Sequence, residues 1–370
     1  MVAHLPKAGL IPRMKASKGP RKLLKSSGRM LFCYFGGCYL GVLPLMKNAE
    51  SRVKTGKSRM RRIIIAGACA LVGSVASAQQ DPQFSQYMFD RLSVNPAVAG
   101  STGNICATML LRQQWSGFDG APKTGLINLQ GPLASINSGL GLSVYFDKLG
   151  QEKSTIARLS YAYHLKVGAQ STLSAGLYAG LSGRALDGNW VAIDPVANDD
   201  AIPTAGKSAS GFDLGAGIYF KTPQMWLGIS STQLPETELK DVSITNKRHF
   251  YVQAGYDWAI GGNKKYTLQP SILLKSDASS TQLDLGALFL YDNMFWLGVG
   301  YRTEDAIAPI LGYQYQFPNG ESMLRIGYSY DVTTSELKNY SSGSHEVMLS
   351  YCFMIVKPVV NEIYHHPRFL

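Results

Sequence analysis

The sequence predicts an all-β fold, a transmembrane antiparallel β-barrel of about 14 strands that follows an N-terminal segment without strand character. Three observations predict this fold. From Asn104 onward the chain repeats segments in which apolar side chains alternate with small, polar or charged ones, and a period of two is typical of β-strands. The connections between these segments alternate between short and long, and a secretory signal precedes them. Together these features are typical of bacterial outer-membrane barrels.

The positive charge of the chain lies in its leader. Residues 1–62 contain 15 Lys or Arg and a single acid, Glu50, whereas the rest of the chain holds 21 basic and 24 acidic residues. The formal net charge of +11 therefore belongs to the leader. Binding to nucleic acid requires basic residues on the folded surface, so we expect no nucleic-acid partner.

Residues 60–78 have the pattern of a secretory signal peptide. Met60–Arg62 form a short positive region, Ile63–Val72 is apolar, and Ala76–Ala78 is an A-x-A cleavage site. This order of charged, apolar and small residues directs export, and the signal is then removed. The mature protein is therefore expected to begin at Gln79 and to reach the outer membrane of a Gram-negative cell.

Residues 1–59 form a basic upstream extension. A signal peptide normally opens a chain, so we expect that Met60 is the true start and that the extension is not translated or is removed. The alternative is a membrane anchor at Leu31–Met46. That stretch is shorter than the roughly 20 residues that a spanning helix needs, and Pro44 interrupts it.

Residues 79–103 contain aromatic, proline and amide residues but no strand period. We expect this segment to plug the lumen of the barrel or to dock on a periplasmic partner, and an ordered plug with no partner is equally open. Backbone groups inside a lumen must find hydrogen-bond partners. Residues 104–355 are assigned to the barrel, and residues 356–370 to a C-terminal tail that is expected to lie in the periplasm or to tuck under the barrel.

Fourteen alternating segments are expected to form the barrel. Long connections fall at odd positions, at 115–122, 186–208, 233–246 and 332–342, whereas the even connections are brief turns such as Thr222-Pro223. Outer-membrane barrels have long surface loops and short periplasmic turns, so this parity favours 14 strands over 12. The expected strands are 104–114, 123–133, 138–148, 152–165, 170–182, 209–221, 224–232, 247–260, 264–275, 280–291, 294–303, 307–317, 321–331 and 343–355.

The two faces of these strands differ in chemistry. In 282–291, Leu283 to Tyr291 at every second position form an apolar face, and Gln282 and Asp284 lie on the other. We expect the apolar face to meet outer-membrane lipid and the other to line a polar lumen. Charged residues of mixed sign are expected on the lumen face, where pairing is favoured over a single-sign selectivity ring because an unpaired charge in a confined lumen is costly. They are Arg112, Asp147, Arg158, Asp213, Lys221, Asp257, Lys275, Asp284, Arg302, Arg325 and Asp331.

Two cysteines follow the signal peptide, Cys106 in the first strand and Cys352 in the last. The first and last strands must be neighbours when a barrel closes, and both cysteines have lumen parity near the periplasmic end. A disulfide across this seam is possible in an oxidising compartment. The strict distance limits of a disulfide, with an unknown register, favour two free buried thiols.

No catalytic arrangement is recognisable, and we expect neither an enzyme nor a cofactor. His345-Glu346 lacks the second histidine of a helical zinc motif, and lumen polarity explains the pair better. His365 and His366 in the tail are too few for a metal site. Glycine pairs such as Gly215/Gly217 and Gly298/Gly300 lack the helix that follows a phosphate-binding loop, and they are expected to leave room in the lumen.

Several stretches closely resemble the PorP/SprF family of type IX secretion system outer-membrane proteins of Bacteroidota, over essentially all of 79–353. The matching stretches are Gln80–Phe89, Asn95–Ser101, Arg112–Trp115, Gly117–Pro122, Gly139–Tyr145, Tyr161–Tyr163, Arg325–Asp331 and Gly343–Glu346. The resemblance implies a barrel fold and a non-enzymatic role in the protein secretion and gliding motility machinery. It also implies two classes of partner, namely periplasmic lipoprotein components and a large secreted surface adhesin.

The expected partner-binding residues lie in two places. In the N-terminal segment they are Phe84, Tyr87, Phe89 and Asn95. In the long surface loop they are Trp190, Asp194, Asp199 and Asp200, because long loops often carry function. A different class of function remains open, since 14 strands can enclose a path for a small or hydrophobic solute and mixed lumen charges do not exclude such a channel.

Overall fold

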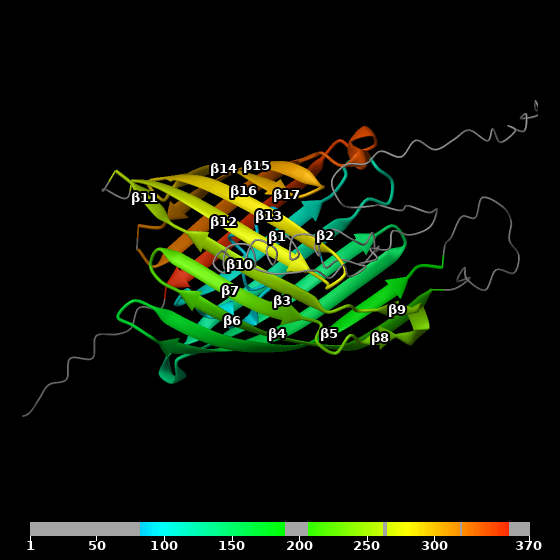
Figure 1. The fold of residues 1–370 in the computed structure, drawn as a ribbon, viewed down its shortest axis with the longest axis horizontal. Helices are drawn as coiled ribbons and strands as arrows, with labels where there is room; N and C mark the ends of the chain where they lie inside the picture. The colour runs from blue at the N-terminus through cyan, green and yellow to red at the C-terminus, as the bar shows by residue number, and fades with distance from the viewer. Residues whose placement is uncertain (1–81, 189–205, 262–264, 319, 355–370) are drawn as a thin grey trace, which may run out of the picture. The chain divides into compact units, whose positions relative to one another are not determined.

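The computed structural model describes residues 82–188, 206–261, 265–318 and 320–354 (Figure 1). Antiparallel strands dominate this part of the chain, and only short 3₁₀ turns accompany them. No helix among the described residues is long and apolar enough to cross a membrane. The strands of the large sheet are β1 Asn104–Gln113, β2 Lys123–Leu133, β3 Ser138–Leu149, β4 Glu152–Lys166, β5 Thr172–Leu186, β6 Lys207–Lys221, β7 Met225–Thr232, β10 His249–Tyr256, β11 Trp258–Ile260, β12 Tyr266–Ser276, β13 Thr281–Tyr291, β14 Phe295–Arg302, β15 Ala306–Gln316, β16 Ser322–Thr333 and β17 Ser344–Met354.

The sheet closes on itself. Strands that follow one another in the sequence pair with one another, and the first strand β1 pairs with the last strand β17. Strands β10 and β11 both pair with β12 and are two parts of one strand, divided at Asp257, whose N–H donates to the Gln224 carbonyl. The described wall is therefore a closed barrel of 14 antiparallel strands, which confirms the predicted fold and strand order.

One predicted loop contains structure of its own. In 233–246 the two-residue strands β8 Glu238–Leu239 and β9 Ile244–Thr245 pair around the 3₁₀ turn η3 Lys240–Val242. The buried Leu239, Val242 and Ile244 pack together against β5 and β6. Two-residue strands carry no measurable period, so alternation in the sequence could not predict this hairpin.

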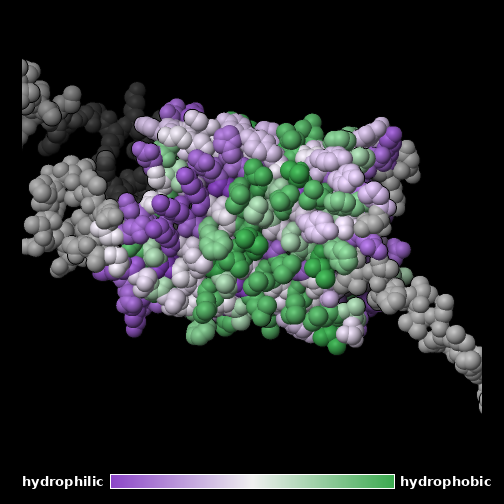
Figure 2. Space-filling model, turned by 180° about the vertical axis from the view of Figure 1, so that it is seen from behind, coloured by the Kyte–Doolittle hydropathy of each residue, from purple (hydrophilic) through white to green (hydrophobic). Residues whose placement is uncertain are grey.

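The outward face of the barrel is apolar. Leu177, Phe212 and Leu297 lie within strands, and each is at least 65% exposed. Hydrophobic side chains form a broad band across the face shown in Figure 2, and hydrophilic residues gather towards its ends. So continuous an apolar surface suits lipid rather than water.

The connections define two ends. The turns 134–137, 222–224, 292–294 and 317–321 are short and lie at one end, and the long connections lie at the other. Because short turns are typical of the periplasmic side of outer-membrane barrels, we call these the periplasmic end and the outer end. Outward aromatic residues at the periplasmic end pair across strands, as Tyr266 does with Tyr291 at 5.4 Å between ring centroids. Such aromatic belts mark a membrane–water interface.

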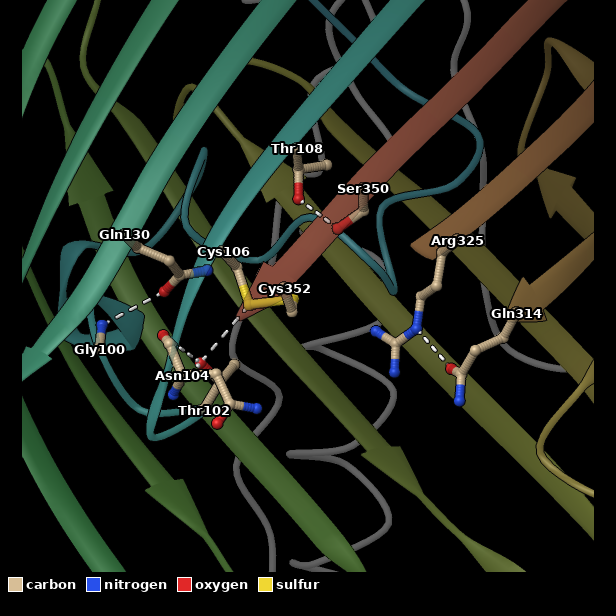
Figure 3. The surroundings of a disulfide bond; sticks show 10 residues. All are labelled: Gly100, Thr102, Asn104, Cys106, Thr108, Gln130, Gln314, Arg325, Ser350 and Cys352. Atoms are coloured by element: carbon tan, nitrogen blue, oxygen red, sulfur yellow. Dashed lines mark hydrogen bonds between the residues drawn. A yellow bond between two sulfur atoms is a disulfide. The ribbon is translucent and has the colours of Figure 1, made fainter. Parts of the chain in front are cut away.

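A disulfide joins the seam between the first and last strands. In the register of β1 and β17, Cys106 lies directly opposite Cys352, and their Cα atoms are 4.1 Å apart. Figure 3 shows the bond beside the hydrogen-bonded pair Thr108 and Ser350 on the same two strands. The sequence-based preference for free thiols was therefore wrong, because the register that it lacked places the two cysteines within bonding distance.

The lumen contains a hydrophobic core that the sequence did not predict. Phe84, Tyr87 and Met88 from the N-terminal segment pack against buried side chains of ten strands. The strand residues are Leu110, Leu126, Tyr145, Ile156, Tyr251, Leu273, Leu288, Trp296, Ile310 and Met348. The expectation of a polar lumen is thus correct only away from this middle layer.

Candidate functional site

The segment Pro82–Gly103, which we call the plug, lies inside the barrel. Its first residues bond to the outer halves of β1, β16 and β17 through Ser85. Its last residues lie at the periplasmic end, where the Gly100 N–H donates to Gln130 Oε1 at 3.2 Å. Between them, the turn η1 Pro96–Val98 is capped by Asn95, whose Oδ1 accepts the Ala97 N–H at 3.0 Å. The plug therefore runs lengthwise through the lumen.

Glycines in the wall make room for the plug. A Cβ atom at Gly176 of β5 would lie 2.5 Å from Ala97 Cα, and one at Gly139 of β3 would lie 2.1 Å from the Ala99 carbonyl oxygen. At Gly217 of β6 it would lie 2.2 Å from Asn95 Oδ1. Real Cβ atoms do not approach this closely, so a larger residue at these positions would force the plug or the wall to shift. The periodic glycines of the sequence are thus, in part, a close-packed seat for this segment.

Four residues form a buried ionic cluster, the outer cluster, in the outer half of the lumen. Arg112 Nη2 lies 2.6 Å from Asp331 Oδ2, and Arg112 Nη1 lies 3.1 Å from Glu346 Oε2. The Glu346 carboxylate also accepts the backbone N–H groups of Ser85 at 2.7 Å and Gln86 at 2.9 Å. The Ser85 hydroxyl donates to Asp331 at 2.8 Å. The outer cluster thus binds three wall strands to one turn of the plug.

A second set of charges continues the outer cluster along the wall. Asp284 lies 2.8 Å from Lys275 Nζ and 3.3 Å from Arg302 Nε, and Arg302 also pairs with Asp305 at 3.1 Å. Lys275 donates to Gln83 Oε1 of the plug at 3.1 Å. Removing one partner from a buried ion pair is strongly destabilising, so the start of the plug is firmly held.

A separate ion pair lies on the opposite wall. Arg158 Nε of β4 donates to Asp213 Oδ2 of β6 at 2.8 Å, and Tyr178 donates to Asp213 Oδ1 at 2.7 Å. The Arg158 guanidinium also lies 4.8 Å from the centre of the Tyr178 ring. Charge pairing and a cation–π contact together offset part of the cost of burying this arginine.

One acid of the plug has little charge compensation. Asp90 is buried, and burial raises its pKa from the ordinary 3.8 to about 6, although hydrogen bonds from Ser93 and Asn128 partly oppose this rise. No described cation lies within ion-pair distance of it. Desolvation disfavours the charged form of a carboxyl group, so Asp90 favours its protonated form more than an exposed aspartate does.

At the periplasmic end a cavity of about 270 Å³ remains between the plug and the strand ends. We call it the vestibule. Its lining includes the cations Arg91, Lys221 and Arg325, the indoles of Trp226 and Trp296, and one acid, Asp257. Smaller spaces in the outer half of the lumen, beside Tyr87 and Arg302, measure about 10 Å³ and 30 Å³. The space at the periplasmic mouth is therefore the largest of these three.

The structure places the predicted lumen charges on the inner face. Arg112, Arg158, Lys275, Asp213, Asp284, Arg302 and Asp331 form the ion pairs given above. The others form hydrogen bonds: Asp147 with Thr124, Asp257 with Gln269, Lys221 with the Ser101 carbonyl and Arg325 with Gln314. Arg112, Arg302, Asp331, Lys275 and Lys221 bond to residues of the plug, and the side chains of the others named here bond within the wall. These charges do not form a ring of one sign.

The predicted partner-binding residues are differently placed. Phe84, Tyr87 and Asn95 are buried against the wall, so their contacts are internal, and Phe89 is half-buried beside the vestibule. A partner-binding role for them stays a prediction. Several expectations lie outside the described residues, namely the extension 1–59, the signal peptide 60–78, Trp190, Asp194, Asp199, Asp200 and the tail 356–370 with His365 and His366.

Sequence reasoning missed two central residues, Ser85 and Glu346. Glu346 was noted only as part of His345-Glu346, whose polarity was assigned to the lumen. The strand separates the two: Glu346 points inward, whereas His345 is on the outward face and bonds to the Tyr328 hydroxyl at 2.7 Å. The parity of Val347 and Leu349, which face lipid, places His345 with them and could have corrected this.

A protein family described as "Type IX secretion system membrane protein PorP/SprF" matches residues 76–351 of this chain. No curated protein matches the sequence.

Several solved structures are similar to this chain at low identity. The CymD monoaromatic hydrocarbon channel is 12% identical with a TM-score of 0.45, over 78% of this chain and 97% of that chain. The Ralstonia pickettii toluene transporter TbuX is 10% identical with a TM-score of 0.42, over 73% and 93% of the two chains. The Acinetobacter baumannii outer membrane protein Omp33 is 10% identical with a TM-score of 0.37, over 68% and 98%.

Proposed function

Because the chain belongs to the PorP/SprF family of type IX secretion system membrane proteins, we propose that it works as a plugged, non-conducting barrel whose two ends bind proteins. It is an outer-membrane β-barrel of this secretion system. In the proposed role it supports the export or surface anchoring of a large adhesin-type protein. Periplasmic lipoprotein components of the secretion and gliding machinery are the expected partners at its periplasmic end.

The observation that carries the proposal is the occupied lumen. The plug packs against ten strands in the middle layer and is bound by the outer cluster above it. A solute path would require the plug to leave, which would expose the apolar middle layer and strip Glu346 and Asp331 of hydrogen bonds. Leaving buried charges without partners costs several kcal/mol. Binding at the ends requires no such change.

The outer end offers a surface for a protein partner. The connections 114–122 and 334–343 are tied together, because the Ser116 N–H donates to the Gly343 carbonyl at 2.7 Å and the Ser342 N–H to the Ser116 carbonyl at 2.8 Å. Phe118 and Tyr340 on these connections are 53% and 72% exposed. Exposed aromatic residues on an ordered surface are typical of protein interfaces.

Two measurements test the proposal together. The mature barrel is extracted gently from its native outer membrane for mass spectrometry of what stays bound, and the purified protein is studied in planar bilayers. We expect periplasmic lipoproteins or one large adhesin to co-purify, and conductance to stay at the level of the bare bilayer. Steady single-channel conductance from a barrel that carries no protein, even after crosslinking, would overturn the proposal and favour a solute channel.

A further inference from the structure

The vestibule contains more hydrogen-bond donors and positive charge than its own residues satisfy. Its lining carries three cations and one acid, Asp257. Asp257 already accepts a hydrogen bond from Gln269. No described carboxylate lies within 4.0 Å of the charged nitrogens of Arg91, Lys221 or Arg325, although every arginine of the outer cluster and its extension has one.

The partners that these cations do have are neutral. Arg325 Nε donates to Gln314 Oε1 at 2.7 Å (Figure 3), and Lys221 Nζ donates to the Ser101 carbonyl at 3.1 Å. Arg91 donates to the Tyr219 hydroxyl at 3.0 Å, and its guanidinium stacks 3.9 Å from the centre of the Trp226 ring. These contacts orient the cations without neutralising them, so the cavity has a positive potential.

Two indole groups add to the excess of donors. The Nε1 atoms of Trp226 and Trp296 are buried and have no hydrogen-bond acceptor among the described residues. Buried polar groups are normally hydrogen-bonded, and those that are not commonly indicate a missing partner. Both indoles line the same cavity as the three cations. A ligand that brings acceptor oxygens and negative charge would satisfy this set.

We propose that the vestibule binds a carboxylate carried by a short, aromatic-containing peptide segment of a periplasmic partner protein. The cavity opens between periplasmic turns and has room for one or two side chains rather than for a folded domain. The planar fork of an arginine matches a carboxylate. The indole faces and the half-buried Phe89 favour an apolar residue beside the acid, which a peptide supplies and a free inorganic anion does not.

This inference deepens the proposed function, because the assignment of the ligand to a protein partner rests on it. The probe is an acetylated and amidated fluorescent peptide, Gly-Phe-Glu-Phe-Glu-Gly, titrated into the purified full-length mature protein in detergent, with fluorescence anisotropy as the readout. A second peptide carries Gln in place of Glu. We expect the Glu peptide to bind on the order of tenfold more tightly, and this preference to shrink as salt concentration rises.

Two variants locate the site. Arg325→Gln and Arg91→Gln should each weaken binding of the Glu peptide on the order of tenfold, since each removes one charge-assisted contact. Arg184→Gln is the matched control, because Arg184 pairs with Glu152 at the outer end and should leave binding unchanged. Should Arg325→Gln fail to fold, Arg91→Gln is still informative, since Arg91 lies in the plug and not in the wall.

The proposed peptide site would be wrong if the Glu and Gln peptides bound equally well, or if binding were unchanged in both variants. It would also be wrong if inorganic phosphate, at the same concentration as the peptide, displaced the peptide completely. The last would indicate a general anion site instead. These outcomes are separate from the test of the proposed function. High conductance with peptide binding intact would contradict only the proposal of a plugged, non-conducting barrel. A non-conducting barrel that does not bind the Glu peptide would contradict only the proposal of a carboxylate site in the vestibule.

Discussion

The two ends of the lumen use similar residues in opposite ways. In the outer cluster, Arg112 has two carboxylates, and the Glu346 carboxylate in turn accepts two backbone N–H groups from the plug. In the vestibule, the hydrogen-bond acceptor of Arg325 among the described residues is the neutral amide oxygen of Gln314. The charges at the outer end therefore compensate one another, whereas the cations at the periplasmic end can still attract a ligand of opposite charge.

Charge alone does not identify a binding site in this barrel. Both ends are rich in arginine, and only the pairing distinguishes a structural cluster from a candidate site. A buried ion pair mainly fixes one arrangement, because its attraction roughly offsets the cost of desolvation. A cation that retains only neutral partners keeps its attraction for an incoming anion. Substitutions at each end should show whether the two ends differ in this way.

The largest effect is expected from Arg112→Gln. The substitution leaves the buried Asp331 and Glu346 facing each other with less compensation, and we expect the barrel to lose about 3–5 kcal/mol of stability. The release of the plug should also raise conductance in planar bilayers. Stability is measured from the temperature at which the band of folded barrel in unboiled gel samples disappears.

Arg184→Gln again serves as the control, since Arg184 pairs with Glu152 and does not contact the plug. It should cost less stability than Arg112→Gln does, because it leaves one carboxylate, Glu152, which is 21% exposed, whereas Arg112→Gln leaves two that are almost fully buried. If Arg112→Gln and Arg184→Gln behaved alike, the outer cluster would not be what holds the plug.

The double variant Cys106→Ser/Cys352→Ser tests the periplasmic end. There a disulfide, rather than a cluster of ion pairs, joins β1 to β17. The disulfide closes a loop with a sequence separation of 246, and its loss should cost about 2–5 kcal/mol. Conductance should stay at the wild-type level, because β1 and β17 remain paired over the full register. The same gel assay and bilayer recording apply.

The control is Thr108→Ala, which removes a hydrogen bond to Ser350 on the same seam and should cost only about 1 kcal/mol. An increase in conductance in the double variant would show that the disulfide also keeps the plug in place.

Alternation in the sequence predicted the barrel well because lipid and lumen impose opposite chemistry on successive residues. All 14 wall strands lie where the period placed them, apart from the break at Asp257, and the inward charges are on the predicted face. The alternation within one strand is enough to predict which side chains face inward, since that depends only on their position in the strand.

Contacts between distant parts of the chain could not be predicted in this way. Ser85 meets Glu346 across 261 positions of sequence, and no period connects the plug to the last strand. The disulfide similarly depends on the register of β1 against β17. The apolar middle layer was missed because Leu110 and Leu288 share the parity of charged neighbours, and their apolar partners come from the plug and from distant strands.

Asp90→Asn tests the middle of the lumen, between the two ends. Because burial raises the pKa of Asp90 to about 6, the folded state binds this proton more tightly than the unfolded state does. Stability therefore falls as pH rises from about 4 to about 6 and stays lower above that range, by up to about 3 kcal/mol. Asparagine can still accept from Asn128 and has no charge to bury.

We expect Asp90→Asn to be more stable than the wild type at pH 7.5 and equally stable at low pH. The measurement is the unfolding temperature of both proteins across this pH range. A parallel pH dependence in the two proteins would show that Asp90 is not the group responsible.

The smallest effect is expected from Gly176→Ala, which tests how closely the plug is seated near the periplasmic end. A Cβ atom there would lie 2.5 Å from both the Cα and the N atom of Ala97, and backbone atoms cannot yield as a flexible side chain would. Overpacking of this kind costs about 1–3 kcal/mol. Gly300→Ala is the matched control, because the nearest neighbour of its Cβ atom would be 3.6 Å away.

If the outer cluster alone fixes the plug, Gly176→Ala should lower stability while conductance stays low. If conductance rises as it does in Arg112→Gln, close packing against the wall and the buried charges are jointly required, and the periplasmic half is as firmly seated as the outer half.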